Sequence, residues 1–559
     1  MQALPNWPNT AAMMWALARA RGGKTMLRSF QDGIWQSMTW QQFASRTAAC
    51  ARALRVAGVS AGDRVLLVSE NRPDFLIAEV ALQSIRAIPV PTYVTNTTAD
   101  HAHVLADSGA RAAIVSTAAL ADRVAQAGPL DLLVCMEKGA PSGLDWQALA
   151  DAPADYSDIA AEAAEIASGA LAVIIYTSGT GGAPRGVMLP HRALLANIAS
   201  VQTLIGRLNL EPGQVYLSFL PLAHAYEHTV GGFILPLLGA EVVYGRGVEH
   251  LAADMLTVRP TIIAMVPRLL EVLRSRILTQ VARQKEWQQK LFHTAISIGR
   301  KRVVGESLAW WEYLADPILE RLVRRKLRDR FGGRFAIGLS GGARLDPELG
   351  RFFQALGLTL LQGYGQTEAG PLISAVAPPN LRLDNIGYPV DGVELRIATD
   401  GEICVRGDLL MDGYWGRPDE TARTIIDGWL HTGDVGEIGR DGALNLTDRK
   451  RDIIVLSGGE NVAPARIEGL LMAEPAIAQA VVTGDGRPWL SALLVPADGV
   501  GEHDVAVAVA RVNKTLSVTE RVRKHILVGP FTLENGLLTA TQKVRRQLVI
   551  KAHQALLEA

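Results

Sequence analysis

The stretch LAVIIYTSGTGGAPRG, residues 171–186, decides how the rest of the chain is interpreted. Its first six residues are an apolar run of the kind that forms a buried strand. After Tyr176 the run breaks into threonine, serine and glycine. Glycine lets a backbone approach an anion closely, and backbone N–H groups and hydroxyls bind phosphate oxygens. The stretch therefore predicts a phosphate-binding loop that follows a strand.

The loop is not a Walker A loop, because GxxxxGK[ST] cannot be aligned on it. The sequence therefore lacks the main motif that would indicate a P-loop kinase or ATPase. On both sides of the loop, from Asp63 to about Gly365, short Val/Ile/Leu-rich runs alternate with longer segments of helical period. This alternation predicts an α/β architecture with largely parallel sheets covered by helices. The runs are 64–69, 112–116, 132–136, 171–176, 215–220, 241–245, 261–266 and 335–340.

The pattern changes after about residue 385, where apolar and polar residues alternate on both sides of Asp400-Gly401, a hairpin signal. We therefore expect an N-terminal domain over 1–447, α/β to about 384, with a small β-barrel-like subdomain over about 385–447. The charged segment 448–453 is expected to be a hinge linker. Residues 454–559 contain their own strand and helix patterns and predict a small, mobile α+β lid domain.

Composition excludes several classes of protein. The 559 residues contain 56 Lys and Arg against 56 Asp and Glu, so no net field attracts nucleic acid. The three cysteines, Cys50, Cys135 and Cys404, have neither zinc-site nor disulfide-framework spacing. No secretory signal is recognisable at the N-terminus. We expect a cytoplasmic protein with no nucleic-acid partner; the oligomeric state is not indicated.

One segment differs from the rest in charge. Residues 281–334 contain thirteen Lys and Arg against six Asp and Glu, with aromatic residues interleaved. Two interpretations stay open. The segment is a solvated helical face, which is the usual reason for a run of charges, or it lies on the anionic surface of the cytoplasmic membrane.

Four further motifs follow the loop in order. They are LQGYGQTEAG (361–370), DGWLHTGD (427–434), DRKRDI (448–453) followed by SGGENV (457–462), and LTATQKVRR (538–546). With the loop, they resemble the AMP-forming adenylate-forming superfamily, most closely its long-chain fatty acyl-CoA synthetases. The resemblance runs from about residue 40 to residue 546. It implies a ligase that uses ATP and CoA as co-substrates and Mg²⁺ as cofactor.

The resemblance also implies roles for individual residues. Tyr364 lies against adenine, Thr367 donates to the α-phosphate, and Glu368 holds Mg²⁺. Gly342 and Ala343 belong to an adenine-side wall, and Gly365 to the nucleotide site. The phosphate loop comprises Thr177, Ser178, Gly179, Thr180, Gly181, Gly182 and Arg185. It departs from the family pattern twice, because Gly181 replaces a usual threonine and Arg185 a usual lysine.

Further roles implied by the resemblance lie towards the C-terminus. Asp434 binds the ribose hydroxyls, with Arg449 assisting, and Asp448 is the hinge residue. Ser457, Gly458, Gly459 and Glu460 face the site during thioester formation and line the CoA side. Lys543 contacts the carboxylate and the α-phosphate as charge builds up between them. His224, in PLAHAYEH (221–228), meets the acyl carboxylate, or is simply a buried histidine with its hydrogen bonds satisfied.

These features predict a long-chain fatty acid–CoA ligase that forms acyl-AMP, releases pyrophosphate and then transfers the acyl group to CoA. Three alternatives stay open. The acceptor is a carrier protein, as for an acyl-AMP or acyl-carrier-protein ligase; the acid is aryl or short; or the chain is a catalytically silent nucleotide-binding homologue.

Overall fold

The computed structural model describes residues 6–140, 142–151, 155–177, 183–206, 208, 210, 212–378, 381–539 and 543–558. Within these residues the chain forms two compact units. The first contains 6–177, 183–394 and 406–430, and the second contains 395–405 and 431–558. Ser178 to Gly182, the centre of the sequence-predicted phosphate loop, lie outside the described residues.

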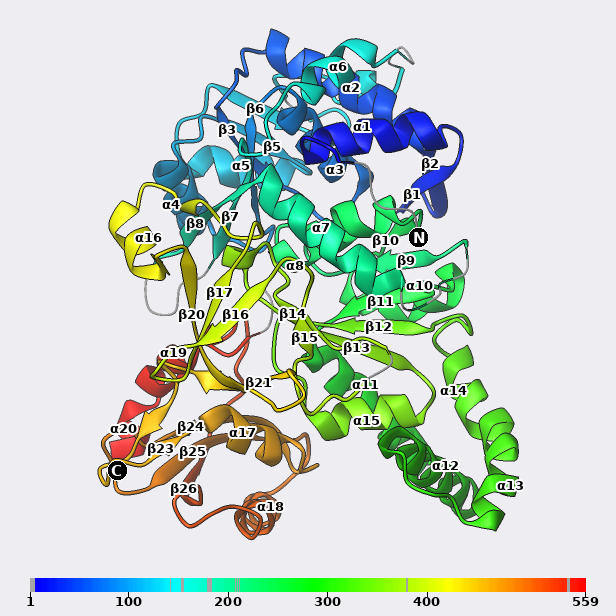
Figure 1. The fold of residues 1–559 in the computed structure, drawn as a ribbon, viewed down its shortest axis with the longest axis vertical. Helices are drawn as coiled ribbons and strands as arrows, with labels where there is room; N and C mark the ends of the chain where they lie inside the picture. Colours follow the sequence, from blue (N-terminus) through cyan, green and yellow to red (C-terminus); the bar gives the residue numbers. More distant parts are fainter. Residues whose placement is uncertain are drawn as a thin grey trace. The chain divides into compact units, whose positions relative to one another are not determined.

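Among the described residues, the largest sheet has nine strands in the order β15-β14-β13-β12-β11-β9-β10-β1-β2 (Figure 1). Strands β13 to β1 in this order are parallel, and antiparallel strands extend both edges. The bounds are β1 (Thr25–Gln31), β2 (Ile34–Thr39), β9 (Val215–Ser218), β10 (Glu241–Tyr244), β11 (Ile262–Met265), β12 (Ile337–Ser340), β13 (Thr359–Tyr364), β14 (Ser374–Ala375) and β15 (Tyr388–Pro389).

A second, wholly parallel sheet has the order β4-β3-β5-β6. Its strands are β3 (Arg64–Val68), β4 (Ile88–Thr92), β5 (Ala112–Val115) and β6 (Leu132–Cys135). All eight apolar runs expected to be strands are strands, and the mixed α/β class with large parallel sheets is confirmed.

The strand before the phosphate loop differs from the expectation of parallel pairing. β7 (Leu171–Thr177) pairs antiparallel with β8 (Arg185–Pro190), and β18 (Gly413–Tyr414) adds to the other edge of β8. The physical reason is loop length, because a parallel crossover needs a dozen or more residues and the connection from 177 to 185 is shorter. The loop therefore joins two strands of a hairpin.

Helices of the first unit cover these sheets. Figure 1 shows α1, α2, α3 and α6 gathered together, and α12, α13 and α15 in a second group. The bounds are α1 (Thr10–Arg21), α2 (Trp40–Val56), α3 (Pro73–Ser84), α4 (Thr98–Ser108), α5 (Ala118–Ala127), α6 (Ser157–Ala164), α7 (His191–Gly206), α8 (Ala225–Thr229), α9 (Leu235–Leu237), α10 (Leu251–Val258), α11 (Pro267–Ala282), α12 (Glu286–Val304), α13 (Trp310–Leu319), α14 (Arg325–Asp329), α15 (Pro347–Ala355) and α16 (Pro418–Thr424).

The β-rich region forms a sheet in the order β16-β17-β20-β19, with β21 paired to β20. The hairpin expected at Asp400-Gly401 joins β16 to β17, and Gly401 has a positive φ of 83° that a left-handed turn position requires. The strands are β16 (Glu394–Ile397), β17 (Glu402–Arg406), β19 (Ile425–Ile426), β20 (Trp429–Ile438) and β21 (Leu444–Arg449).

The C-terminal part of the second unit is a small α+β structure around its own core, which includes Ile467, Val482, Leu494 and Val505. Its sheet has the order β24-β25-β26, and β22 pairs with β23. The bounds are β22 (Ile454–Val455), β23 (Asn461–Val462), α17 (Pro464–Met472), β24 (Ile477–Thr483), β25 (Leu490–Pro496), α18 (Glu502–Asn513), β26 (Val522–Leu527), α19 (Arg546–Ala552) and α20 (Gln554–Glu558).

Candidate active site

The mouth of the phosphate loop is held by paired residues of the β7–β8 hairpin. Thr177 and Arg185 are register partners. Thr177 Oγ1 and Arg185 Nε are both buried, and neither has a hydrogen-bond partner among the described residues. Burying a polar atom without a partner is unfavourable. A hydroxyl and a guanidinium N–H left in this state at one loop mouth are suited to an anionic ligand.

Arg185 is the centre of a charged cluster in the first unit. Its guanidinium lies over the Tyr414 ring, 4.2 Å from the ring centre, and its Nη1 lies 3.0 Å from Glu420 Oε2. Its Nη2 lies 4.0 Å from Glu368 Oε1, the same oxygen that accepts a 2.9 Å hydrogen bond from the Tyr414 hydroxyl. The hydrogen bond from Arg185 lowers the pKa of Glu420. The family-divergent arginine is therefore held in a cluster with Tyr414, Glu420 and Glu368.

The predicted adenine wall and the predicted catalytic loop lie at one edge of the large sheet. β12 and β13 are parallel neighbours, with Ser340 opposite Gln362. Gly342 and Ala343 follow the first strand, and Tyr364 ends the second. Ligand sites of open α/β sheets form at this carboxyl edge.

The turn after β13 requires its glycine. A Cβ on Gly365 would lie 1.8 Å from the Pro371 carbonyl oxygen, so a larger residue cannot be accommodated without moving the backbone. The chain then makes a single 3₁₀ turn, Thr367–Ala369, which carries Thr367 and Glu368 beyond the sheet edge. Gly365 is therefore required by the fold of this turn, whereas Thr367 and Glu368 are the residues expected to carry the chemistry.

Glu368 is suited to a magnesium ion held partly by phosphate. Its carboxylate is nearly buried, and only Oε1 has a hydrogen-bond partner within the described residues. The same residues contain no group of three or more His, Cys, Asp or Glu side chains placed to hold a metal. Mg²⁺ commonly binds through one or two carboxylates together with substrate phosphates and water, so a single carboxylate with a free oxygen fits this ion.

His224 is the N-cap of α8, and its Nδ1 accepts a 3.2 Å hydrogen bond from the Tyr226 N–H. The ring proton is therefore assigned to Nε2. The Tyr226 hydroxyl donates to the Leu339 carbonyl at 2.8 Å, and its ring packs closely on Gly341, next to the adenine wall. The His224 segment and the wall are thus structurally linked.

The base of α8 is held by buried groups that the sequence did not reveal. Glu227 is fully buried and accepts 2.6 Å hydrogen bonds from the Tyr216 hydroxyl and the Ser218 hydroxyl. Burial raises the pKa of Glu227 to about 7, although the hydrogen bonds from these two donors lower it. His228 pairs with Glu79 at 2.5 Å on the other side. These contacts fix the helix that carries His224.

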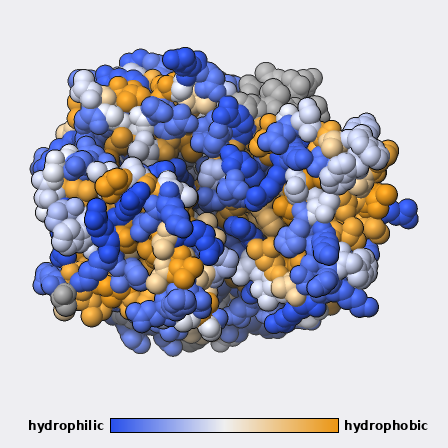
Figure 2. All heavy atoms as spheres, turned by 90° about the horizontal axis from the view of Figure 1, so that it is seen from below, coloured by the Kyte–Doolittle hydropathy of each residue, from blue (hydrophilic) through white to orange (hydrophobic). Residues whose placement is uncertain are grey.

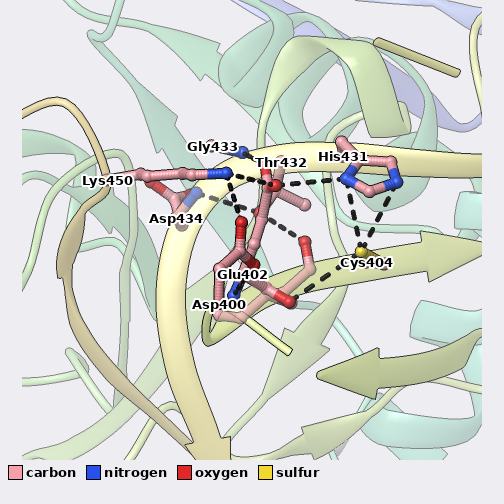
Figure 3. A network of polar contacts seen from close by, with 9 residues as sticks. Asp400, Glu402, Cys404, His431, Thr432, Gly433, Asp434 and Lys450 are labelled. Atoms are coloured by element: carbon pink, nitrogen blue, oxygen red, sulfur yellow. Dashed lines mark hydrogen bonds and ion pairs between the residues drawn. The ribbon is translucent and has the colours of Figure 1, made fainter. Parts of the chain in front are cut away.

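In the second unit, β20 and β21 bring the predicted ribose pair together. Asp434 is the register partner of Arg449, and Asp434 Oδ1 lies 3.2 Å from Arg449 Nε. Asp434 is buried and Arg449 is about half exposed. The Asp434 backbone N–H also donates to Thr432 Oγ1 at 3.1 Å. Figure 3 shows Thr432 and Asp434 beside a network that includes Glu402 and Lys450.

Asp448 is the residue before Arg449, and its carboxylate is hydrogen-bonded to the backbone. Its two carboxylate oxygens accept hydrogen bonds from the N–H groups of Arg449, at 2.7 Å, and Ala465, at 3.0 Å. Burial raises the pKa of Asp448 against these donors. The predicted hinge residue thus joins β21 to the start of α17.

Lys543 is in the same unit as the ribose pair. Its backbone N–H donates to Thr539 Oγ1 at 3.0 Å, in a turn closed by the bridge between Leu538 and Val544. Although the residue as a whole is exposed, desolvation of its ammonium group lowers the pKa of Lys543 to about 8. Repulsion from Arg449 acts in the same direction, and attraction to Asp434 opposes it. The distant C-terminal motif therefore lies within electrostatic reach of the predicted ribose pair.

Ser457, Gly458, Gly459 and Glu460 form the exposed turn between β22 and β23. The turn is closed by the Leu456 N–H, which donates to the Glu460 carbonyl at 2.9 Å. Gly459 has a positive φ of 87°, as such a turn requires. The Ser457 N–H donates to the Arg487 carbonyl at 3.0 Å, which ties the turn to the loop between β24 and β25.

Tyr414, Arg417 and Glu420 were missed by sequence reasoning. Arg417 contacts Glu420 at 3.2 Å and Asp107 at 3.0 Å, and the Tyr176 hydroxyl donates to Asp107 at 2.7 Å. The sequence does carry a helix-start signal here, Pro418 with two acidic residues after it. It contains no local signal for the contact between Glu420 and Arg185, which are 235 residues apart.

The first unit combines a parallel sheet, a hairpin whose strands flank the Gly-rich segment, and a carboxylate suited to Mg²⁺. The second unit contains a carboxylate–arginine pair and a lysine. These features are those expected of an adenylate-forming enzyme. Residues 14–415 match the family of AMP-binding enzymes, and residues 451–559 match the AMP-binding enzyme C-terminal domain. The chain belongs to this family, the adenylate-forming superfamily. It is an adenylate-forming ligase by family.

Two relatives are similar to this chain over most of its length. The chain is 32% identical to the long-chain-fatty-acid–CoA ligase FadD15 of Mycobacterium tuberculosis H37Rv, over 99% of this chain and 96% of that protein. It is 28% identical to the long-chain-fatty-acid–[acyl-carrier-protein] ligase AEE15 of Arabidopsis thaliana, over 92% and 82%.

Solved structures share the fold. The anthranilate CoA ligase AuaEII in complex with anthranoyl-AMP aligns with a TM-score of 0.77 at 20% identity, covering 99% of both chains. The O-succinylbenzoate CoA synthetase MenE of Bacillus subtilis, in complex with ATP and magnesium, aligns with a TM-score of 0.72 at 21% identity, covering 96% of this chain and 98% of that chain.

Proposed function

We propose that this protein activates a long-chain fatty acid with ATP, forming acyl-AMP and pyrophosphate, and then transfers the acyl group to CoA. The observation that carries the nucleotide part is the pair of buried, unpartnered atoms at the loop mouth, Thr177 Oγ1 and Arg185 Nε. The full-length similarity to FadD15 supports the acid and the acceptor.

In the first step the chain's main contribution is positioning and electrostatics, as in phosphoryl-group chemistry generally. Arg185, with Thr177, binds the polyphosphate, and its guanidinium exchanges Glu420 for phosphate oxygens. Thr367 donates to the α-phosphate, and His224 orients the acyl carboxylate for in-line attack. Glu368 would hold Mg²⁺, which would supply positive charge to neutralise the phosphates of ATP.

The ribose is held by Asp434, because each of its oxygens can accept a hydrogen bond from one of two vicinal hydroxyls. Lys543 opposes negative charge that develops between the carboxylate and the α-phosphate. For the second step, a backbone change at Asp448 withdraws Lys543 and brings Ser457–Glu460 to the pantetheine of CoA.

Lys543 gives this proposal a pH signature. Its ammonium is the active form, and a pKa of about 8 means that this form is lost as pH rises through 8. We expect kcat/KM for ATP in acyl-AMP formation, which reports the free enzyme, to fall about 10-fold between pH 7 and pH 9. In Lys543→Arg the fall should move to a much higher pH, because guanidinium stays protonated. An identical descending limb in that variant would assign it to another group.

The proposal is tested by release of AMP and pyrophosphate from Mg-ATP across acids from acetate to oleate, with and without CoA. Turnover that requires CoA and is fastest with long chains is expected. Faster turnover of short or aryl acids would show that one of these acids, and not a long-chain fatty acid, is the substrate. The similarity to AEE15 favours an acyl-carrier protein as a second candidate acceptor. A single burst of pyrophosphate that added CoA does not convert into continuous turnover would point to that acceptor in place of CoA.

We also propose that the α13–α14 arm, residues 310–330, contacts an anionic membrane surface, from which a long-chain acid is collected. The described part of the chain contains no helix long and apolar enough to cross a membrane. Apolar residues do reach the surface among hydrophilic ones in the view from below (Figure 2). On α13, large apolar side chains with exposed fractions of 58–78% recur at helical spacing; they are Trp310, Tyr313, Leu314 and Ile318. Exposed basic residues follow at Arg321 and Arg325.

Reversing both of these charges, Arg321→Glu with Arg325→Glu, should weaken binding to vesicles of phosphatidylcholine and phosphatidylglycerol about 30-fold, at roughly 1 kcal/mol for each basic residue lost at the surface. Co-sedimentation measures the change, and Lys514→Glu in the second unit serves as the matched control. Equal binding by wild type, arm variant and control would rule out this surface.

A further inference from the structure

Glu402 is a buried carboxylate with three donors, and none of the sequence motifs includes it. Its Oε1 accepts a 2.8 Å hydrogen bond from the Gly433 backbone N–H. Its Oε2 lies 3.1 Å from His431 Nδ1 and 3.1 Å from Lys450 Nζ (Figure 3). Lys450 Nζ also contacts Asp400 at 2.6 Å.

A carboxylate in this position is costly unless it is satisfied. Burial raises the pKa of Glu402, but the His431, Gly433 and Lys450 donors prevail and lower it overall. The group is therefore ionised at neutral pH and binds its donors through charge-assisted hydrogen bonds, which are the strong class. Glu402 is thus a fixed negative point inside the sheet.

Two of the three donors flank the predicted ribose pair in the sequence. Gly433 precedes Asp434, and Lys450 follows Arg449. The two strands are also linked here, because the Lys450 N–H donates to the Gly433 carbonyl at 2.8 Å. Gly433 has a positive φ of 71°, a conformation that glycine adopts readily, so the chain turns here immediately before Asp434.

The other end of the network reaches β17. The Thr432 hydroxyl donates to the Ile403 carbonyl at 2.7 Å and accepts from the Asp434 N–H. Cys404 Sγ lies 3.6 Å from His431 Nδ1. His431 and Gly433 contact Glu402 directly, Thr432 bonds to the neighbouring Ile403 of β17, and Asp434 is linked to β17 through Thr432. Glu402 also binds Lys450, so it is the side chain that joins β17 to both strands of the ribose pair.

We infer that Glu402 is a positioning residue for nucleotide recognition: it does not touch the nucleotide, and it sets the direction of the Asp434 carboxylate and its partner Arg449 toward the two ribose hydroxyls. The inference rests on the proposed ribose role of Asp434. It assigns part of the selectivity for ribonucleotides to a residue 32 positions upstream of the carboxylate that accepts the hydroxyls.

The test uses the full-length enzyme with ATP and 3′-deoxy-ATP. The wild type should prefer ATP by about 10- to 100-fold in kcat/KM, the worth of one hydrogen bond to a charged group. Glu402→Gln keeps the shape and removes the charge. It should raise KM for ATP by about 10-fold or more, change kcat less, and reduce the preference for ATP to a few-fold. Affinities for AMP and 3′-deoxy-AMP, measured by calorimetry, should converge in the same way.

Glu394→Gln removes an exposed carboxylate paired with Arg406 and is the matched control, with wild-type behaviour expected. Lys450→Ala, at a half-exposed side chain, should also reduce the preference for ATP, but by less. This variant provides the test if Glu402→Gln does not fold. An unchanged ATP preference in both folded variants, or equal losses for ATP and its deoxy analogue, would overturn the inference. A wild type that does not distinguish the two nucleotides would instead refute the proposed role of Asp434.

Discussion

Lys543→Ala is expected to slow acyl-AMP formation about 1000-fold and to leave CoA transfer from supplied acyl-AMP within a few-fold of wild type. The reason is that the lysine stabilises charge that develops only in the first transition state, and removing one such preorganised group costs about 10²–10³ in rate. The ammonium of Lys543 interacts electrostatically with Asp434 and Arg449, the predicted ribose pair, as this role requires.

The two half-reactions are measured separately, by pyrophosphate release in single turnover and by acyl-CoA formation from synthetic acyl-AMP. Lys551→Ala, an exposed basic residue on α19, is the matched control and should change neither rate. Equal losses in both half-reactions would contradict the role assigned to Lys543, because a withdrawn lysine cannot slow the second step.

Glu368→Gln should lower kcat by about 100-fold or more and shift half-saturation by Mg²⁺ to higher concentration. A neutral amide is a poorer ligand for a hard cation than a carboxylate, and Glu368 keeps one oxygen without a hydrogen-bond partner in the described structure. Initial rates over a magnesium titration at saturating ATP measure both effects.

Two variants separate the metal role from damage to the neighbouring cluster. Tyr414→Phe removes the hydrogen bond to Glu368 and should alter the magnesium dependence little. Glu348→Gln, at an exposed position on α15, should behave as wild type. A Glu368→Gln enzyme whose magnesium dependence matches wild type would exclude the assigned ligand.

The departure at Arg185 now has a structural reason. An arginine can stack its planar group on Tyr414 and still present two nitrogens to Glu420 and Glu368, whereas a lysine ammonium offers one point charge. A residue so fully incorporated favours specialisation over decay, and this counts against the silent-homologue alternative. Gly181, the other departure, lies outside the described residues.

Much of the fold could be predicted because buried parallel strands leave an obvious apolar signature, as in 262–265 and 337–340. The antiparallel pairing of β7 could not be read from its apolar pattern, since both faces are buried as in a parallel strand. The short loop to Arg185 carried that information instead.

The site was predictable where chemistry is confined to a motif and unpredictable where it depends on side chains brought together by folding. Thr367 and Glu368 stand in a recognisable run, and the structure explains their turn through Gly365. Glu402 and Glu420 stand in ordinary strand and helix contexts. Their roles become visible only from their hydrogen-bond partners, Gly433 and Arg185, which lie 31 and 235 residues away. A single sequence contains no record of such pairs.

Formation of acyl-AMP before any acceptor is present is the step on which the proposed function depends. It is tested by exchange of radiolabelled pyrophosphate into ATP, in the absence of CoA and with oleate as the acid. We expect exchange that depends on both the acid and Mg²⁺ and that Lys543→Ala abolishes. Absence of exchange with every acid tested, while the protein still binds ATP, would contradict it.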